Sequence, residues 1–216
     1  MPALDALEDG LRTTSQIMIG VLFLTAAPCA GYSADIQLAA RYGGTQFTSE
    51  AAVVSPDQEG YVGGTLFVAL DVTGPAVVWT LQPLLSYEYQ WDGDDETSYI
   101  KTHSDIFTIG ASRVFEVGYA HASLKGGAAY FGDTYDVKIE EEPRIKHVAN
   151  GWGVSIGMDL QFKFLDHLDA VVGYKYLGRT KPIFDDTTPG GIPYRVEGRR
   201  AEHCISAGVV VKIGGI

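Results

Sequence analysis

The chain has 216 residues, with 27 acidic and 16 basic side chains and a formal net charge of −11 at neutral pH. This acidity argues against a nucleic acid partner, because phosphate binding requires a basic face. The composition is 46% hydrophobic and includes 26 glycines and 12 tyrosines, which argues against disorder and against a helical bundle. Glycine and tyrosine are poor helix formers, and tyrosine is favoured in strands.

The first 34 residues differ from the rest of the chain. Ile17–Ala30 is an apolar run with the length of a signal-peptide core, too short to span a bilayer as a helix. Small residues follow, with plausible cleavage after Ala30 or Ala34. We therefore predict a signal peptide at residues 1–34. Its removal would take away Cys29 and leave Cys204 without a partner, so no internal disulfide is expected.

After this segment, apolar and polar residues alternate, which predicts strands because successive side chains on a strand point to opposite faces. The first three predicted strands are about Ala34–Phe47, Glu59–Val72 and Ala76–Trp91. Thr48–Gln58 is predicted to be a loop. Thr73-Gly74-Pro75 is predicted to be a tight turn between the second and third strands.

Two strands with milder faces follow, at about Asp105–Val114 and Ala120–Val137. A turn within Phe115–Tyr119 joins them. Long acidic loops are predicted on either side of this pair, at Asp92–Ser104 and Lys138–Asn150.

The clearest pattern is the predicted hairpin Gly151–Arg179, whose two arms turn at Leu165-Asp166-His167-Leu168. Arms of this length are long for a soluble domain but suit strands that cross a membrane at a tilt. Thr180–Gly198 is then predicted as a long loop, and Arg199–Ile213 as the last strand. The apolar face of the hairpin is expected to contact lipid: Trp152, Val154, Ile156, Met158, Leu160, Phe162, Tyr174 and Tyr176.

These elements predict an all-β fold, an eight-stranded antiparallel up-and-down transmembrane β-barrel at residues 35–216. Long and short connections alternate, and aromatic residues gather near strand ends, as in membrane barrels. The second face mixes glycine with both signs of charge, which predicts a paired polar network in the lumen: Arg41, Glu88, Asp159, Lys163, Lys175, Glu202 and Lys212. A soluble lipocalin-like carrier, with the apolar face turned inward, is the alternative.

Phe164–Gly178, FLDHLDAVVGYKYLG, carries a family resemblance through its short Asp-His-Leu turn and its Gly-Tyr-x-Tyr strand. The chain resembles the small eight-stranded outer-membrane barrels, the OmpA-, OmpX- and OmpW-like group also called the porin-family β-barrel domain. The resemblance implies a place in the outer membrane of a Gram-negative bacterium and contact with lipid and lipopolysaccharide. It also implies insertion by the outer-membrane assembly machinery, which reads a last strand ending in Phe or Trp. Here Val211-Lys212-Ile213 stands at that position.

The sequence contains no metal cluster, phosphate-binding loop or nucleophile elbow, and we expect no cofactor and no metal. His121 and Ser123 share a strand face and are weak catalytic candidates, because lipid A deacylases of similar size use a His-x-Ser pair. The residue after the serine is Leu124, where that family has asparagine. The acidic stretches Asp92–Glu96 and Glu140–Glu142 could hold divalent cations or could simply be solvated loops.

We therefore expect a non-enzymatic outer-membrane protein that serves envelope structure or surface interaction through acidic external loops, its surface ligand being unknown. The alternatives are a lipid A deacylase-like enzyme, a narrow channel for small solutes, or the soluble carrier. Eight strands leave a lumen just wide enough for side chains, which weighs against the channel.

Overall fold

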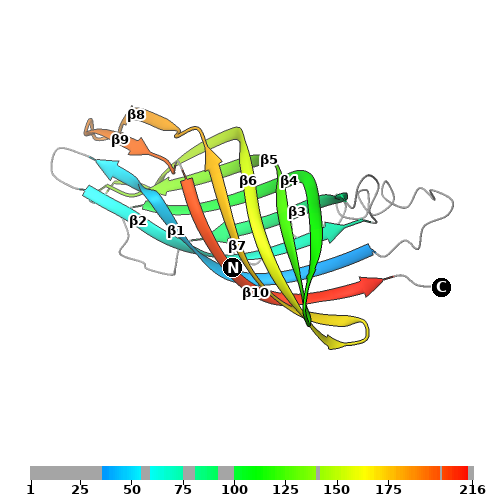
Figure 1. The fold of residues 1–216 in the computed structure, drawn as a ribbon. Coiled ribbons are helices and arrows are strands. Elements are labelled where there is room, and N and C mark those ends of the chain that lie inside the picture. Colours follow the sequence, from blue (N-terminus) through cyan, green and yellow to red (C-terminus); the bar gives the residue numbers. More distant parts are fainter. Residues whose placement is uncertain are drawn as a thin grey trace. The chain divides into compact units, whose positions relative to one another are not determined.

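The computed structural model describes residues 36–54, 59–74, 81–91, 100–139, 142–199 and 201–213, all within one compact unit, Asp35–Ile216. The predicted signal peptide and the acidic residues Asp92–Glu96, Glu140 and Glu141 lie outside the described residues. In the described part, no helix is long and apolar enough to cross a membrane. The strands (Figure 1) are β1 (Ile36–Val54), β2 (Glu59–Thr73), β3 (Leu81–Trp91), β4 (Ile100–Val117), β5 (Ala120–Val137), β6 (Ile145–Leu165), β7 (Leu168–Arg179), β8 (Ile183–Thr187), β9 (Pro193–Glu197) and β10 (Ala201–Ile213).

Strands β1 to β7 and β10 form a closed antiparallel barrel. Each pairs with its neighbour along the chain, and β10 pairs with both β7 and β1. The closing ladder runs from Ile36↔Ile213 to Phe47↔Glu202. Closure leaves the wall with no free edge along this ladder, so its backbone groups are satisfied without water. The predicted eight-stranded up-and-down barrel is confirmed.

Two-residue turns close one end of the barrel, which we call the turn end. Gly118–Tyr119 joins β4 to β5, and Asp166–His167 joins β6 to β7. Gly118 has a φ of 59°, the left-handed conformation that a tight hairpin turn requires and that glycine adopts without strain. Both turns lie where the sequence predicted them. The opposite end, where β8 and β9 lie, is the loop end (Figure 1).

At the loop end several strands are longer than predicted. β4 begins at Ile100 and not at Asp105, and β6 begins at Ile145 and not at Gly151. β1 continues to Val54, through most of the segment predicted as a loop. The strands therefore extend well beyond the stretch in which their apolar residues face outward.

These differences arise because the alternation reverses along the strand: the apolar residues lie on the inward face in one part and on the outward face in the other. On β6, Ile145 and Ala149 pack inward against buried apolar residues, while Lys146 and Asn150 are exposed. From Trp152 toward the turn end the apolar residues face outward instead. A pattern search that follows one apolar face ends the strand at the point where the face changes.

The predicted loop Thr180–Gly198 contains a further hairpin, β8–β9. β9 pairs with the end of β1, from Ala52↔Glu197 to Val54↔Arg195, and so continues the wall beyond the start of β10. The inner face of the hairpin joins a buried apolar group at the loop end, which we call the loop-end core: Ile100, Tyr135, Val137, Ile139, Tyr194 and Val196, with Phe184 packed against them.

The tight turn predicted at Thr73-Gly74-Pro75 is wrong. Thr73 pairs with Leu84, and the Gly74 N–H donates to the Pro83 carbonyl at 3.0 Å, so the connection between β2 and β3 is longer than three residues. The first residues of the predicted third strand, 76–80, lie outside the described residues.

Candidate functional site

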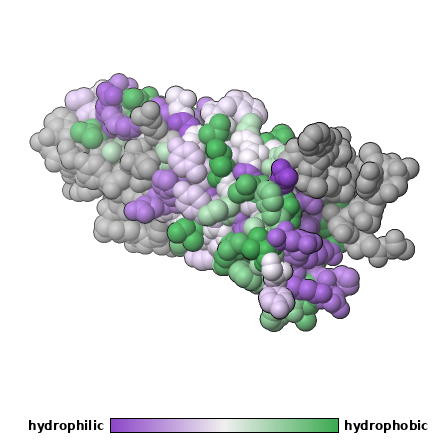
Figure 2. All heavy atoms as spheres, viewed as in Figure 1, coloured by the Kyte–Doolittle hydropathy of each residue, from purple (hydrophilic) through white to green (hydrophobic). Residues whose placement is uncertain are grey.

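The face predicted to contact lipid points outward. Ile156, in its middle, is 59% exposed, an accessibility that in water would be costly for a row of large apolar side chains. Of the eight predicted residues, Tyr176 is half-buried and the others are exposed. The seven exposed residues and further outward residues of β7 and β10 form an apolar band: Trp152, Val154, Ile156, Met158, Leu160, Phe162, Val172, Tyr174, Ile205, Val209 and Val211. Figure 2 shows hydrophobic residues gathered on this part of the wall and hydrophilic residues around the β8–β9 hairpin.

An aromatic row borders the band on four adjacent strands. Tyr87, Phe107, Tyr130 and Trp152 occupy paired positions on β3, β4, β5 and β6. The ring centroids of Tyr87 and Phe107 are 4.9 Å apart, and those of Tyr130 and Trp152 are 5.2 Å apart. Aromatic rings concentrate in this way at the boundary between hydrocarbon and water.

Inside the barrel, Arg41 is held between two carboxylates. Its two terminal nitrogens donate to Asp159 Oδ1 and Oδ2 at 2.5 and 2.6 Å, and its Nε lies 3.0 Å from Asp71 Oδ2. Lys125 Nζ lies 2.7 Å from Asp71 and 2.8 Å from Asp159. Two bases and two acids from β1, β2, β5 and β6 thus link opposite walls across the lumen.

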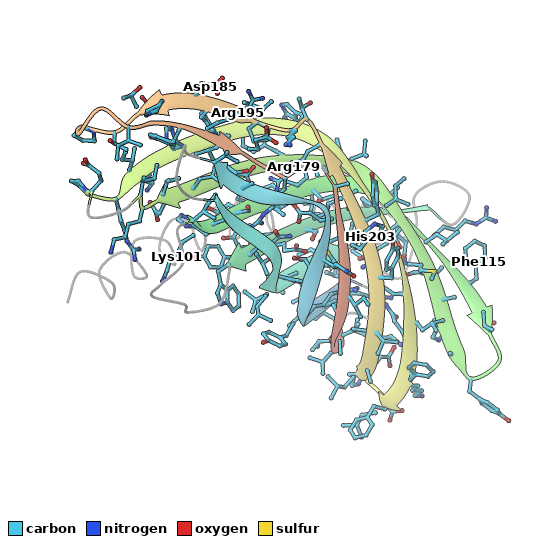
Figure 3. All side chains as sticks on the ribbon, turned by 90° about the vertical axis from the view of Figure 1, so that its left-hand side faces the viewer. Lys101, Phe115, Arg179, Asp185, Arg195 and His203 are labelled. Carbon is cyan, nitrogen blue, oxygen red and sulfur yellow. The ribbon has the colours of Figure 1, made fainter. Side chains whose placement is uncertain are left out.

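A second group of ionic contacts lies closer to the loop end. Lys175 binds Glu88, and the Gln90 amide donates to Glu88 at 2.7 Å and to Glu202 at 2.8 Å. Arg179 binds both Glu202 and Asp133. In Figure 3 Arg179 lies in the barrel beneath the hairpin that carries Asp185 and Arg195.

The charges of this lumen network balance. Its members are five acids and five bases: Asp71, Glu88, Asp133, Asp159 and Glu202, with Arg41, Lys125, Lys175, Arg179 and Arg199. Close pairing of opposite charges is required here, because a buried ion without a partner is strongly destabilising. Since the lumen network is neutral, the excess of acid in the chain lies outside it.

Apolar layers separate and cover these ionic groups. The inward residues of β5 illustrate the order from the turn end: Lys125 in the first group, then Ala129 and Phe131, then Asp133, then Tyr135 in the loop-end core. The cavity beside Arg41 and Lys125 measures about 30 Å³, room for one or two water molecules. At this level of the barrel the side chains of the lumen network therefore leave little free space.

The structure brings most of the predicted lumen residues together. Arg41, Glu88, Asp159, Lys175 and Glu202 belong to the lumen network. Lys212 lies nearer the turn end, where its Nζ is 2.6 Å from Asp169 Oδ2.

Lys163 was predicted in the lumen and lies elsewhere. Its side chain is 62% exposed and pairs with Asp166 of the turn at 3.3 Å. Lys163 pairs with Asp169 in the last rows of the β6–β7 ladder before the turn, and from there its side chain reaches the turn residue Asp166.

Other network members did not emerge from the sequence reading, among them Asp71, Lys125 and Asp133. Each occupies a position in the alternation of its strand at which side chains point inward, and that position is the signal that could have identified it. On β5, however, glycine and alanine occur on both faces, so the sequence did not show which face points inward.

The weak catalytic candidates do not form an accessible site. Ser123 is buried in the lumen, where its Oγ lies 3.4 Å from Asp159 Oδ2, and Asp159 is already bound by Arg41 and Lys125. His121 lies on the same strand opposite Gln161 and Glu116. Within the described residues, no cluster of three or more His, Cys, Asp and Glu side chains could hold a metal ion.

The β8–β9 hairpin has polar contacts of its own. The imidazole Nε2 of His147 on β6 lies 2.8 Å from the Tyr194 hydroxyl on β9, and that hydroxyl donates to Asp186 Oδ2 at 3.4 Å. Burial, together with the Asp186 carboxylate, raises the pKa of Tyr194 to about 12. On the outer face of the hairpin, Lys181 binds Glu197 and holds the pKa of that carboxyl below its usual range.

A closed antiparallel barrel with an apolar exterior, an aromatic border and a charge-paired interior defines a class, the small outer-membrane β-barrels. The chain has this fold, and the localisation expected from the sequence, the outer membrane of a Gram-negative bacterium, is confirmed by it.

Solved structures of this class are similar to the chain at low sequence identity. Neisserial surface protein A (NspA) matches at 11% identity and a TM-score of 0.55, over 84% of this chain and 100% of that one. The outer membrane protein OprG from Pseudomonas aeruginosa matches at 10% identity and a TM-score of 0.60, over 85% and 97%. A major outer membrane protein from Thermus thermophilus matches at 10% identity and a TM-score of 0.59, over 84% and 100%.

No protein-family model matches the sequence, and no curated protein matches it. The likeness to the solved structures is therefore one of fold.

Proposed function

We propose that the chain is a non-enzymatic, non-conducting barrel that stabilises the envelope and presents an acidic surface at the loop end. The lumen network carries this proposal. Side chains that cross-link opposite walls make the barrel rigid, and the apolar layers between the two ionic groups and at the loop end oppose the passage of ions. A barrel built to conduct would need a continuous hydrated path, and the cavity beside Arg41 is about 30 Å³.

Planar-bilayer recording tests the closed lumen. The purified full chain should give no unitary current in concentrated potassium chloride. A double variant, Arg41→Ala with Lys125→Ala, removes two bases from one cross-section and serves as a comparison. Discrete unitary currents from the unmodified chain, with an ion selectivity that changes in the double variant, would contradict the proposal.

The surface role rests on the distribution of charge. Because the lumen network is neutral, the net negative charge is carried by other parts of the chain, and Asp185 and Asp186 are exposed on the hairpin at the loop end. We expect this end to meet cations and the phosphates of lipopolysaccharide through bridging divalent ions.

A loop exchange tests this surface role. Neutral residues in place of 92–99 should reduce the binding of cells to a cationic surface, whereas neutralising Glu116 and Asp166 at the turn end should leave it unchanged. Equal effects of the two exchanges would contradict the proposed surface.

Hydrolysis of lipid A acyl chains is the enzymatic alternative. Ser123 faces the lumen and is bound to Asp159, whereas an acyl chain would meet the barrel on its outer wall. We expect lipid A mass spectra to be identical in strains that express the unmodified chain and the Ser123→Ala variant.

A further inference from the structure

The β8–β9 hairpin fills a gap in the barrel wall between β1 and β6 at the loop end. On one side β9 is fixed to β1 by a ladder of three residue pairs. On the other side, among the described strands, no ladder joins β8 to β6. The contacts across this second seam are made by side chains, so the hairpin is held by backbone pairing at one edge only.

His147 of β6 makes the polar contacts across the seam. Its Nε2 lies 2.8 Å from the Tyr194 hydroxyl and 4.0 Å from Asp186 Oδ2. Its ring stacks on Phe184, with centroids 4.9 Å apart and an interplanar angle of 26°. One imidazole therefore touches both strands of the hairpin from the opposite side of the seam.

Protonation of this imidazole would strengthen the contacts. A charged imidazole carries a proton on both nitrogens, so Nε2 becomes a fixed donor to the Tyr194 oxygen. The Tyr194 hydroxyl is then free to donate to Asp186, to which it already points at 3.4 Å. The new positive charge also lies 4.0 Å from the Asp186 carboxylate. We propose that His147, Tyr194 and Asp186 form a pH-sensitive latch that docks the hairpin more tightly as the pH falls.

The other titratable groups near the seam do not compete for this role. Tyr135 of β5, the cross-strand neighbour of His147, is buried in the loop-end core. Arg195 of β9 faces outward, where it is paired with Asp185 and Glu197. Histidine is the side chain whose ordinary pKa falls between pH 5 and 8, where carboxylates are ionised and tyrosines are neutral.

The latch goes beyond the proposed closed barrel, because it concerns the rim and not the lumen. With the latch weakened, Tyr194, Val196 and Phe184 would separate from the rest of the loop-end core more often, and the hairpin's own ladder and its ladder to β1 would open more readily. The lumen network beneath would stay paired, so the shape of the surface would change with pH while conductance would not.

Hydrogen exchange read by mass spectrometry tests the latch on the full chain folded in lipid nanodiscs, at pH 5.5 and 8.0. After correction for intrinsic exchange rates, amides of 183–187 and 194–197 should be roughly three- to tenfold more protected at pH 5.5, the range expected for one partly buried ion pair and its hydrogen bond. His147→Gln should remove this difference. His203→Gln, which changes a histidine on the outer wall, should keep it.

Equal protection of the unmodified hairpin at both pH values would overturn the latch, and so would a pH difference that persists in His147→Gln. If His147→Gln does not fold, Asp186→Asn is tested in its place. A diminished pH difference in that variant would support the latch, and an unchanged difference would overturn it. Planar-bilayer recordings at the same two pH values test the closed lumen separately. A unitary current would contradict the proposed function, and the exchange result would still decide whether the latch exists.

Discussion

Two outward residues of β6, Met158 and Val148, offer a direct test of which part of the wall contacts hydrocarbon. Both are 56% exposed, both are apolar, and both stand on the same face of the strand. They differ in their place along it, since Met158 lies within the apolar band and Val148 lies on the loop-end side of Trp152. We predict that Met158→Arg destabilises the folded barrel far more than Val148→Arg.

The size of the difference follows from the geometry of the strand. The two residues are ten positions apart, which at about 3.3 Å per residue and a tilt of about 40° separates them by roughly 25 Å along the membrane normal. The apolar band of such barrels is about 25 Å tall, so a residue near its middle lies about 12 Å from either edge. Val148 is then well outside the hydrocarbon. Arginine at the midplane costs about 2–4 kcal/mol and near the interfaces about 0–1 kcal/mol.

Equilibrium unfolding in guanidinium chloride, followed by tryptophan fluorescence in phospholipid vesicles, measures both free energies of unfolding. A gap of about 2 kcal/mol or more between the variants is expected in vesicles, because the penalty for arginine depends on its depth in the hydrocarbon. A soluble barrel would tolerate arginine equally at both exposed positions. Equal free energies of unfolding in vesicles would therefore refute the assignment of the band to lipid.

Three further predictions concern the lumen, the wall and the hairpin. Arg41→Met leaves two buried carboxylates with one base and should lower the free energy of unfolding by about 3–5 kcal/mol, as measured in the same vesicle assay. Gly110→Val should cost about 1–3 kcal/mol, because a Cβ there would lie 2.1 Å from a backbone oxygen of β5, whereas Gly151→Ala, with no atom within 4 Å, should be close to neutral. Tyr194 has a pKa raised to about 12, so its contribution to hairpin docking should be complete below pH 10 and lost between about pH 10 and 12. Ultraviolet titration of the phenolate, compared with Tyr194→Phe, measures this, and a transition centred near 10 would contradict it.

The strands and the two faces of each strand could be predicted from the sequence because both depend on a local rule, whereas the outward direction of the apolar face was predicted from the alternating loop lengths and the aromatic residues near strand ends. Alternation on β6 and β7 is a property of adjacent residues, and it assigned Val154, Ile156 and Leu160 to one face without knowledge of any partner strand. The same rule located the turns at Gly118 and His167.

The ion pairs of the lumen could not be predicted, because they depend on the register of strands far apart in the chain. Arg41 and Asp159 are 118 residues apart, and they meet because β1 and β6 lie on facing walls. Alternation indicated that both point inward but not that they touch. The β8–β9 hairpin was missed for a different reason. Its strands have five residues each, and the Asp185-Asp186 pair makes β8 resemble a loop.

The outward residues change from polar to apolar at one row of the barrel, and the position of that row cannot be seen from either part of a strand alone. On β4 the outward residues change from Lys101, His103 and Asp105 to Phe107 and Ile109 toward the turn end. On β6 they change between Asn150 and Trp152. The two changes fall on the same paired rows, because Asp105 pairs with Gly132, which pairs with Asn150, and the next outward row is the aromatic row.

A soluble barrel is surrounded by water over its whole outer surface, so its outward residues need not change from apolar to polar at matched positions on separate strands. A barrel that passes from hydrocarbon into water requires the outward residues to become polar at the boundary. Beyond that boundary it needs an apolar interior to hold the wall together, as the loop-end core does here. We therefore infer that the row at which the outward face changes lies at the membrane surface, and that the loop-end core is the part of the barrel that is built as a soluble domain would be.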